Sequence, residues 1–173
     1  MKTKGIIIGL SLALCLIAFF MRDWFLTFFS TEIIGENFLF NDSQPLSQQI
    51  FPTLIFVFSF GIIPFLYLFV KNYCKISSTK NHVLSLLIIT GSGLIFFGMR
   101  VIYLKYRIAQ IRDLLKRAEF TSDGDLPGIS YQDMHLESYL LAGVLIGGLL
   151  SLIIFKKSSN QRNNVRQFDA SSK

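Results

Sequence analysis

Charged side chains are scarce in this sequence. Asp, Glu, Lys and Arg together make up 16% of its 173 residues, whereas a soluble domain carries about 25%. Hydrophobic residues make up 51%, and the mean hydropathy is +0.50. The length leaves room for one domain, and the composition is typical of a chain that faces lipid.

The motifs of the common catalytic and metal sites are also missing. The sequence has no HExxH, CxxC, GxSxG or phosphate-binding loop, and two cysteines are too few for a disulfide framework. Asp123 and Asp125 resemble the start of a calcium loop, but Pro127 and Met134 stand where that loop needs oxygen ligands. We therefore expect a protein that is not an enzyme and has no metal or cofactor.

Four long stretches contain no Asp, Glu, Lys or Arg, and they cover residues 5–21, 50–70, 82–99 and 138–155. About 20 helical residues cross a hydrocarbon core of about 30 Å. Because that core holds no water for backbone hydrogen bonds, each stretch must be a helix. The sequence predicts an all-α integral membrane protein, with a four-transmembrane-helix bundle over residues 1–155.

The first apolar stretch resembles a signal peptide, because Lys2 and Lys4 precede it. The residues that follow it, Met21 to Trp24, contain no small-x-small cleavage site. We therefore expect this segment to be retained as the first membrane helix.

Basic residues predict the orientation, because Lys and Arg resist translocation across a membrane. Segments 1–4, 71–81 and 156–173 carry ten basic residues and one acidic residue. Segments 22–49 and 100–137 carry seven basic residues and ten acidic ones. The first three segments are therefore predicted to be cytoplasmic, so both termini are expected on the cytoplasmic side of a plasma or inner membrane. The last of them is predicted to be a disordered basic tail.

The net charge of +6 raises nucleic acid as a partner. The basic residues flank apolar runs, however, and lack the interleaved aromatics of a single-strand binder. We expect the lipid bilayer as a partner, and no nucleic acid.

Small residues predict where helices pack, because lipid supplies no hydrophobic drive and helices associate through close backbone contact. Gly143, Gly147 and Ser151 recur every four residues in the last apolar stretch, and Gly91 and Gly98 stand seven apart in the third. These stripes predict either packing within one chain or self-association.

An apolar stripe continues beyond the third stretch. Val101, Leu104, Ile108, Ile111 and Leu115 are spaced three and four residues apart, which predicts that the third helix extends past the membrane on the outer side. The stripe must be covered by the first outer loop, the headgroup region, a second copy or another protein. Ile108, Ile111 and Leu115 are the predicted interaction surface.

Four polar residues are predicted to gather at the outer mouth of the bundle: Arg100, Asp133, His135 and Glu137. Arg100 directly follows an apolar stretch, so it either snorkels to the headgroups or faces a buried acid. The period-two spacing of the other three does not place them on one helical face, which argues against a metal site. A membrane enzyme that uses these three residues is the third functional hypothesis.

Two functional hypotheses stand before it. The first is a non-catalytic multi-pass protein that binds a membrane protein, as a small complex subunit or an immunity-like or regulatory partner. The topology is similar to that of the longer immunity proteins against pore-forming colicins, in architecture alone. The alternative is a small oligomeric channel or carrier, with a bend at Gly61 and Pro64 in a pore-lining helix.

Asn41 begins a glycosylation sequon on the first outer loop.

Overall fold

The computed structural model describes residues 2–34, 46–74, 78–117 and 134–171, and within these ranges it contains helices and no strand. The helices are α1 (Lys2–Ile34), α2 (Leu46–Gly61), α3 (Ile63–Cys74), α4 (Thr79–Arg117) and α6 (Leu136–Ser171). Four helical segments are long and apolar enough to cross a membrane, with α2 and α3 together forming one of them. This confirms the prediction of an all-α chain with four apolar helices of spanning length.

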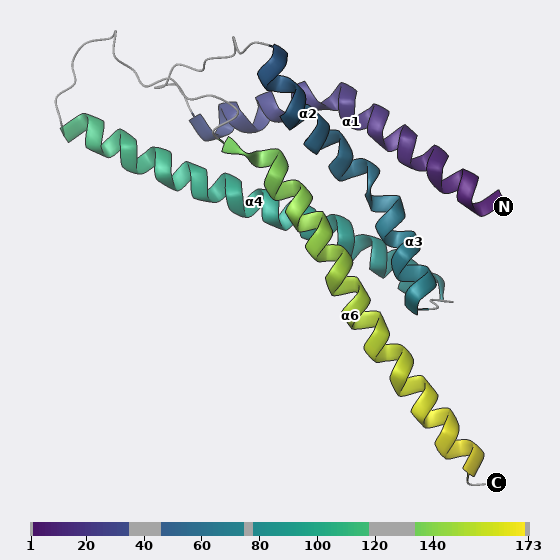
Figure 1. Ribbon diagram of the computed structural model, residues 1–173. Helices are drawn as coiled ribbons and strands as arrows, with labels where there is room; N and C mark the ends of the chain where they lie inside the picture. The colour runs from purple at the N-terminus through teal and green to yellow at the C-terminus, as the bar shows by residue number, and fades with distance from the viewer. Residues whose placement is uncertain (1, 35–45, 75–77, 118–133, 172–173) are drawn as a thin grey trace.

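The helices alternate in direction along one elongated bundle (Figure 1). The N-terminus and the α3–α4 connection lie toward the right of this view, whereas the ends of α1 and α4 and the start of α6 lie toward the left. Helix α6 crosses α4 and also packs on α2 and α3, while α1 packs chiefly on α2. The helix α6 is therefore in contact with three neighbouring helices.

The closest packing in the bundle joins α4 and α6. A Cβ atom added at Gly143 would lie 2.7 Å from the Ser92 carbonyl oxygen, and one at Gly147 would lie 2.9 Å from the Ile88 carbonyl oxygen. Such distances are shorter than real Cβ contacts, so only glycine fits at either position. The stripe read from the sequence lies in this interface.

Serine side chains satisfy their hydrogen bonds inside the same interface. The hydroxyls of Ser85 and Ser151 are 2.7 Å apart, and Ser92 Oγ donates to the Gly143 carbonyl at 2.8 Å. Ser85 and Ser151 are fully buried. Because both hydroxyls have partners, their burial does not carry the cost of an unpaired polar group.

The expectation for the third helix needs correction, because a Cβ at Gly91 or Gly98 would meet nothing within 4 Å. The glycine of α4 that faces α6 is Gly93, where an added Cβ would lie 2.7 Å from a methyl group of Val144. Gly91 and Gly98 share a helical face, as their spacing implies, but this face does not contact the neighbouring helices closely.

The break between α2 and α3 occurs at Ile62, between the two residues predicted to bend this helix. Pro64 has no N–H, so the usual helical bond to the Phe60 carbonyl cannot form. Ser11 Oγ of α1 donates to the Gly61 carbonyl at 2.5 Å, and a Cβ at Gly61 would collide with Cys15 Sγ. Gly61 and Pro64 are both buried, and α1 packs against the bend at Gly61.

Phenylalanines hold α1 to the rest of the bundle. The ring centroids of Phe25 lie 5.5 Å from Phe56 of α2 and 5.1 Å from Phe97 of α4, and Phe29 lies 4.8 Å from Phe97. Tilted and edge-on rings at these separations attract beyond the area that they bury. This aromatic cluster joins three helices near the start of α6.

Two helices continue beyond the predicted borders. The sequence predicts a loop from residue 22, but α1 runs on to Ile34, because Leu26, Ser30 and Ile33 are buried at helical spacing. The sequence also predicts disorder from residue 156, whereas α6 continues to Ser171. No Gly or Pro follows Gly148, so nothing in the local chain breaks a helix that packing has already nucleated.

Substitution of the interface glycines should separate close contacts from open positions. We expect Gly143→Ala to lower the free energy of unfolding by about 1–3 kcal/mol, because the new methyl group overpacks the α4–α6 contact. Gly98→Ala is the matched control, and it should be neutral or stabilise by up to about 1 kcal/mol through helix propensity. Denaturant unfolding of the two purified variants measures both values, and equal effects would contradict the assignment of this interface.

Candidate functional site at the start of α6 and the end of α4

Arg100 of α4 fastens the chain just before α6. Its Nε donates to the Met134 carbonyl oxygen at 2.9 Å. Its guanidinium carbon lies 4.9 Å from the ring centroid of Tyr139 and 5.5 Å from that of Tyr103. A charged donor on a backbone carbonyl, with cation–π contacts to two rings, forms a stronger contact than snorkelling alone would give.

The backbone that Arg100 holds is strained. His135 has a φ of +48°, a left-handed conformation that is uncommon for any residue except glycine. Met134 and Leu136 on either side are each 1% exposed, whereas the His135 side chain is exposed. The burial of its two neighbours therefore fixes the strained residue and turns its ring outward.

Glu137 is a buried acid in the first turn of α6, with 5% of its surface exposed. The side chains of His135 and of Arg22 of α1 lie close enough to act on its carboxyl group electrostatically. A carboxylate in the first turn of a helix also interacts favourably with the helix dipole. Glu137 therefore places a buried carboxyl group near Arg22 of α1.

Arg22 was not among the residues predicted from the sequence. Its side chain is 13% exposed and donates to Asp23 at 2.8 Å, while its buried Nε has no hydrogen-bond partner. The signal that could have identified it is the one that identified Arg100, an arginine directly after a long uncharged stretch.

The structure thus brings Arg100, His135 and Glu137 to one end of the bundle. Arg22 lies at the same end. Asp133 lies outside the described residues. Within the described part of the chain, no three His, Cys, Asp or Glu residues are grouped closely enough to hold a metal ion.

The apolar stripe beyond Arg100 is covered in part by α1. Val101 and Ile108 are 8% and 5% exposed, in one buried cluster with Leu26 and Ile33 of α1. Ile108 therefore faces its own chain, which corrects its assignment to the interaction surface. The cover exists because α1 continues as a helix where a loop was expected.

An ion pair joins the two helices beside this stripe. Lys105 Nζ of α4 lies 2.7 Å from Glu32 Oε1 of α1, with both side chains about half exposed. An exposed pair contributes about 1 kcal/mol or less to stability. The pair joins the last turn of α1 to α4.

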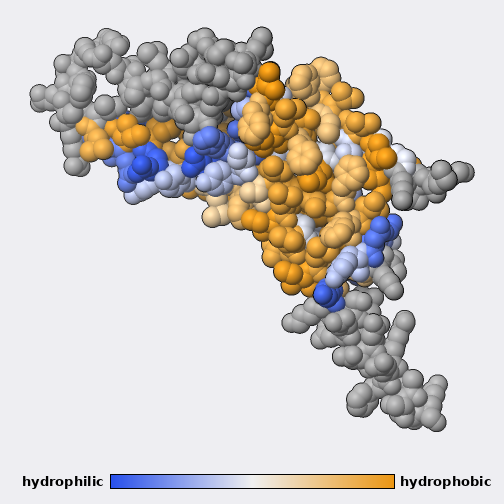
Figure 2. Space-filling view, in the orientation of Figure 1, coloured by the Kyte–Doolittle hydropathy of each residue, from blue (hydrophilic) through white to orange (hydrophobic). Residues whose placement is uncertain are grey.

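The last described turns of α4 remain uncovered. Ile111 is 41% exposed and Leu114 is 64% exposed, and the Leu115 side chain lies outside the described residues. Figure 2 shows apolar and hydrophilic side chains side by side along this projecting part of α4. We name Ile111 and Leu114 the distal α4 face.

Removal of the Arg100 contacts should loosen the start of α6. Because a hydrogen bond from a charged donor contributes about 1.5–3 kcal/mol, Arg100→Ala should raise amide hydrogen exchange over residues 136–140 by roughly tenfold to a hundredfold. Arg107→Ala removes an exposed arginine of the same helix and should leave that exchange unchanged. Equal exchange in the two variants would show that Arg100 does not hold α6.

Comparison with known proteins gave no match to any protein-family model, curated protein or solved structure. Function is therefore inferred from the residues of this chain and their contacts.

Proposed function

We propose that this chain is an integral membrane protein with both termini in the cytoplasm, and that it works without catalysis by binding another membrane protein. The proposed partner contacts the distal α4 face on the outer side. The chain would then serve as a small subunit of a complex, or as an immunity-like or regulatory partner.

The exposed apolar surface supports placement in a plasma or inner membrane. Phe20 is 78% exposed, Ile6 is 69% exposed and Phe51 is 71% exposed, and apolar side chains cover the visible face of the bundle in Figure 2. In water, such a continuous surface would drive aggregation, whereas in a bilayer it faces acyl chains of matching polarity.

The charge distribution supports the orientation. The start of α1, the end of α3 and the start of α4 lie at one end of the bundle, and α6 runs toward the same side (Figure 1). Segments 1–4, 71–81 and 156–173 carry ten of the 17 Lys and Arg residues. By the positive-inside rule this end is cytoplasmic. The ends of α1 and α4 then lie outside.

The distal α4 face is the observation that carries the binding proposal. Ile111 lies 11 residues beyond Arg100, which is about 16 Å along a helix, so in this orientation it lies past the hydrocarbon. The described part of the chain leaves this face exposed, and the Lys105–Glu32 pair joins α4 to α1 six residues before Ile111. An exposed apolar face on a fixed helix is a suitable contact for a protein partner.

The alternative function is a small oligomeric channel or carrier. Its motivation was the bend at Gly61 and Pro64, which would line a pore. Both residues are buried and the bend contacts α1 through Ser11 and Cys15. This packing favours a structural role for the bend, so the binding proposal is preferred.

Placement and orientation can be tested together by cysteine labelling in intact cells. Ala109→Cys should react with a membrane-impermeant maleimide, whereas Ser78→Cys should react only after permeabilisation; both positions are exposed. The native chain is the control, because Cys15 and Cys74 lie within apolar helices and should stay unlabelled. The reverse labelling pattern would overturn the orientation, and release of the chain by alkaline carbonate would overturn membrane insertion.

Photocrosslinking should identify what covers the distal α4 face. A photoreactive residue at Ile111 should give one discrete product of higher mass in native membranes. The same residue at Ala109, on the opposite side of the helix, should give little. Copies that carry two different tags distinguish a second copy from another protein.

A charge on the same face should break the contact. Ile111→Glu should weaken recovery of the crosslinked partner by about tenfold or more, because an apolar residue at the centre of an interface contributes about 2 kcal/mol. Equal crosslinking from Ile111 and Ala109, or none from either, would contradict the binding proposal.

A further inference from the structure

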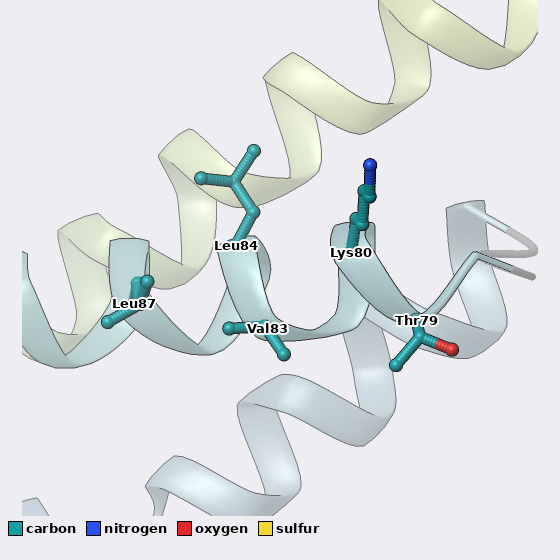
Figure 3. A pocket seen from close by; sticks show the side chains of 5 residues that line it. All are labelled: Thr79, Lys80, Val83, Leu84 and Leu87. Carbon is teal, nitrogen blue, oxygen red and sulfur yellow. The ribbon is translucent and has the colours of Figure 1, made fainter.

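An open apolar groove runs along the first turns of α4, at the opposite end of this helix from the distal α4 face. Its volume is about 390 Å³. Five residues line it: Thr79, Lys80, Val83, Leu84 and Leu87. Figure 3 shows that Lys80 and Leu84 project to the same side of α4, one turn apart. The groove therefore combines apolar walls with one positive charge at its end.

The walls of the groove are uncovered by the rest of the described chain. Val83 is 54% exposed, Leu84 is 47% exposed and Leu87 is 60% exposed. They follow one another along about two turns of helix, a length of roughly 10 Å from Lys80 to Leu87. A flexible hydrocarbon chain fits against such a surface, since the contact needs length and apolarity and no specific hydrogen bonds.

The charge at the end of the groove has no acidic partner nearby. The sequence contains no Asp or Glu from Leu46 to Arg112, and among the described residues Lys80 forms no ion pair. Lys156, which follows the last apolar stretch, lies over the Tyr73 ring at 5.7 Å. An anion with an apolar tail is therefore complementary to the groove in both charge and polarity.

We propose that this groove binds a phospholipid of net negative charge, with its phosphate at Lys80 and an acyl chain along Val83, Leu84 and Leu87. This inference rests on the proposed membrane placement, in which Lys80 lies at the cytoplasmic leaflet, where anionic lipids attract juxtamembrane lysines. A zwitterionic phospholipid, or an apolar helix of a second copy, would occupy the same walls without needing the lysine.

Fluorescence quenching by brominated lipids can report on the groove directly. The chain has one tryptophan, Trp24, which is exposed and stacked on Phe28, so Trp24→Phe gives a background without tryptophan. Leu87→Trp then places the reporter in the groove, seven residues from Lys80. Leu149→Trp is the matched control, an exposed position of α6 seven residues from Lys156.

Each full-length variant is reconstituted in bilayers of phosphatidylcholine that contain brominated phosphatidylglycerol. The reporter at Leu87 should show a preference of about fivefold for the anionic lipid, since one lysine near the surface contributes about 1 kcal/mol. The reporter at Leu149 should show a smaller preference, because Lys156 already lies over the Tyr73 ring. Lys80→Gln should abolish the preference at Leu87, and Lys156→Gln should not.

Three results would overturn the lipid site. These are an equal preference at Leu87 and Leu149, a preference that survives Lys80→Gln, or no quenching at Leu87, which would indicate that protein fills the groove. Failure of the chain to enter the bilayers would instead overturn the proposed membrane placement. The two failures are therefore distinguishable in one experiment.

Discussion

The close approach of α4 and α6 is the contact on which the rest of the bundle depends. In the proposed lipid setting there would be no hydrophobic drive between helices, so packing would come from dispersion and hydrogen bonds at short range. Gly143 and Gly147 let the two helices approach this closely, and serine hydroxyls form hydrogen bonds within the interface. Gly148, the next residue, faces a different helix, since a Cβ there would lie 3.3 Å from Leu66 of α3. Adjacent glycines therefore let α6 approach two neighbours at once.

The two ends of this bundle are held by different chemistry. At the end near the α3–α4 connection, Val70, Cys74 and Phe155 form a small apolar cluster, and Cys74 Sγ contacts the Leu152 carbonyl at 3.8 Å. A thiol buried in this way contributes to packing and is not accessible for lipidation or redox chemistry. At the other end, charged side chains connect the helices: Arg100 donates a hydrogen bond to the Met134 carbonyl, and Lys105 pairs with Glu32. That end presents acidic as well as basic side chains to a partner.

The sequence predicted the helices well, because an absence of charge over about 20 residues has a single physical meaning in lipid. It identified the stripe at Gly143 and Gly147 on α6, but on α4 it pointed to Gly91 and Gly98, which do not face α6. A seven-residue spacing shows that two residues share a helical face, but it does not show whether that face is packed. It also ended α1 too early at Arg22 and Asp23. These two residues pair with each other, so they are compatible with a continuing helix, and this continuation is what covers Ile108.

The uninterrupted helix α4 joins the groove beside Lys80 to the distal α4 face. Leu87 and Ile111 are 24 residues apart, about 36 Å along a helix, with no loop between them to absorb a displacement. Gly91 and Gly98 lie in this interval and pack closely on nothing, so they are where the helix bends most easily. Between them Gly93 is fixed against α6, and beyond them Arg100 is fixed to the start of α6. Both attachments of α4 to the α6 region therefore lie between the groove and the distal α4 face.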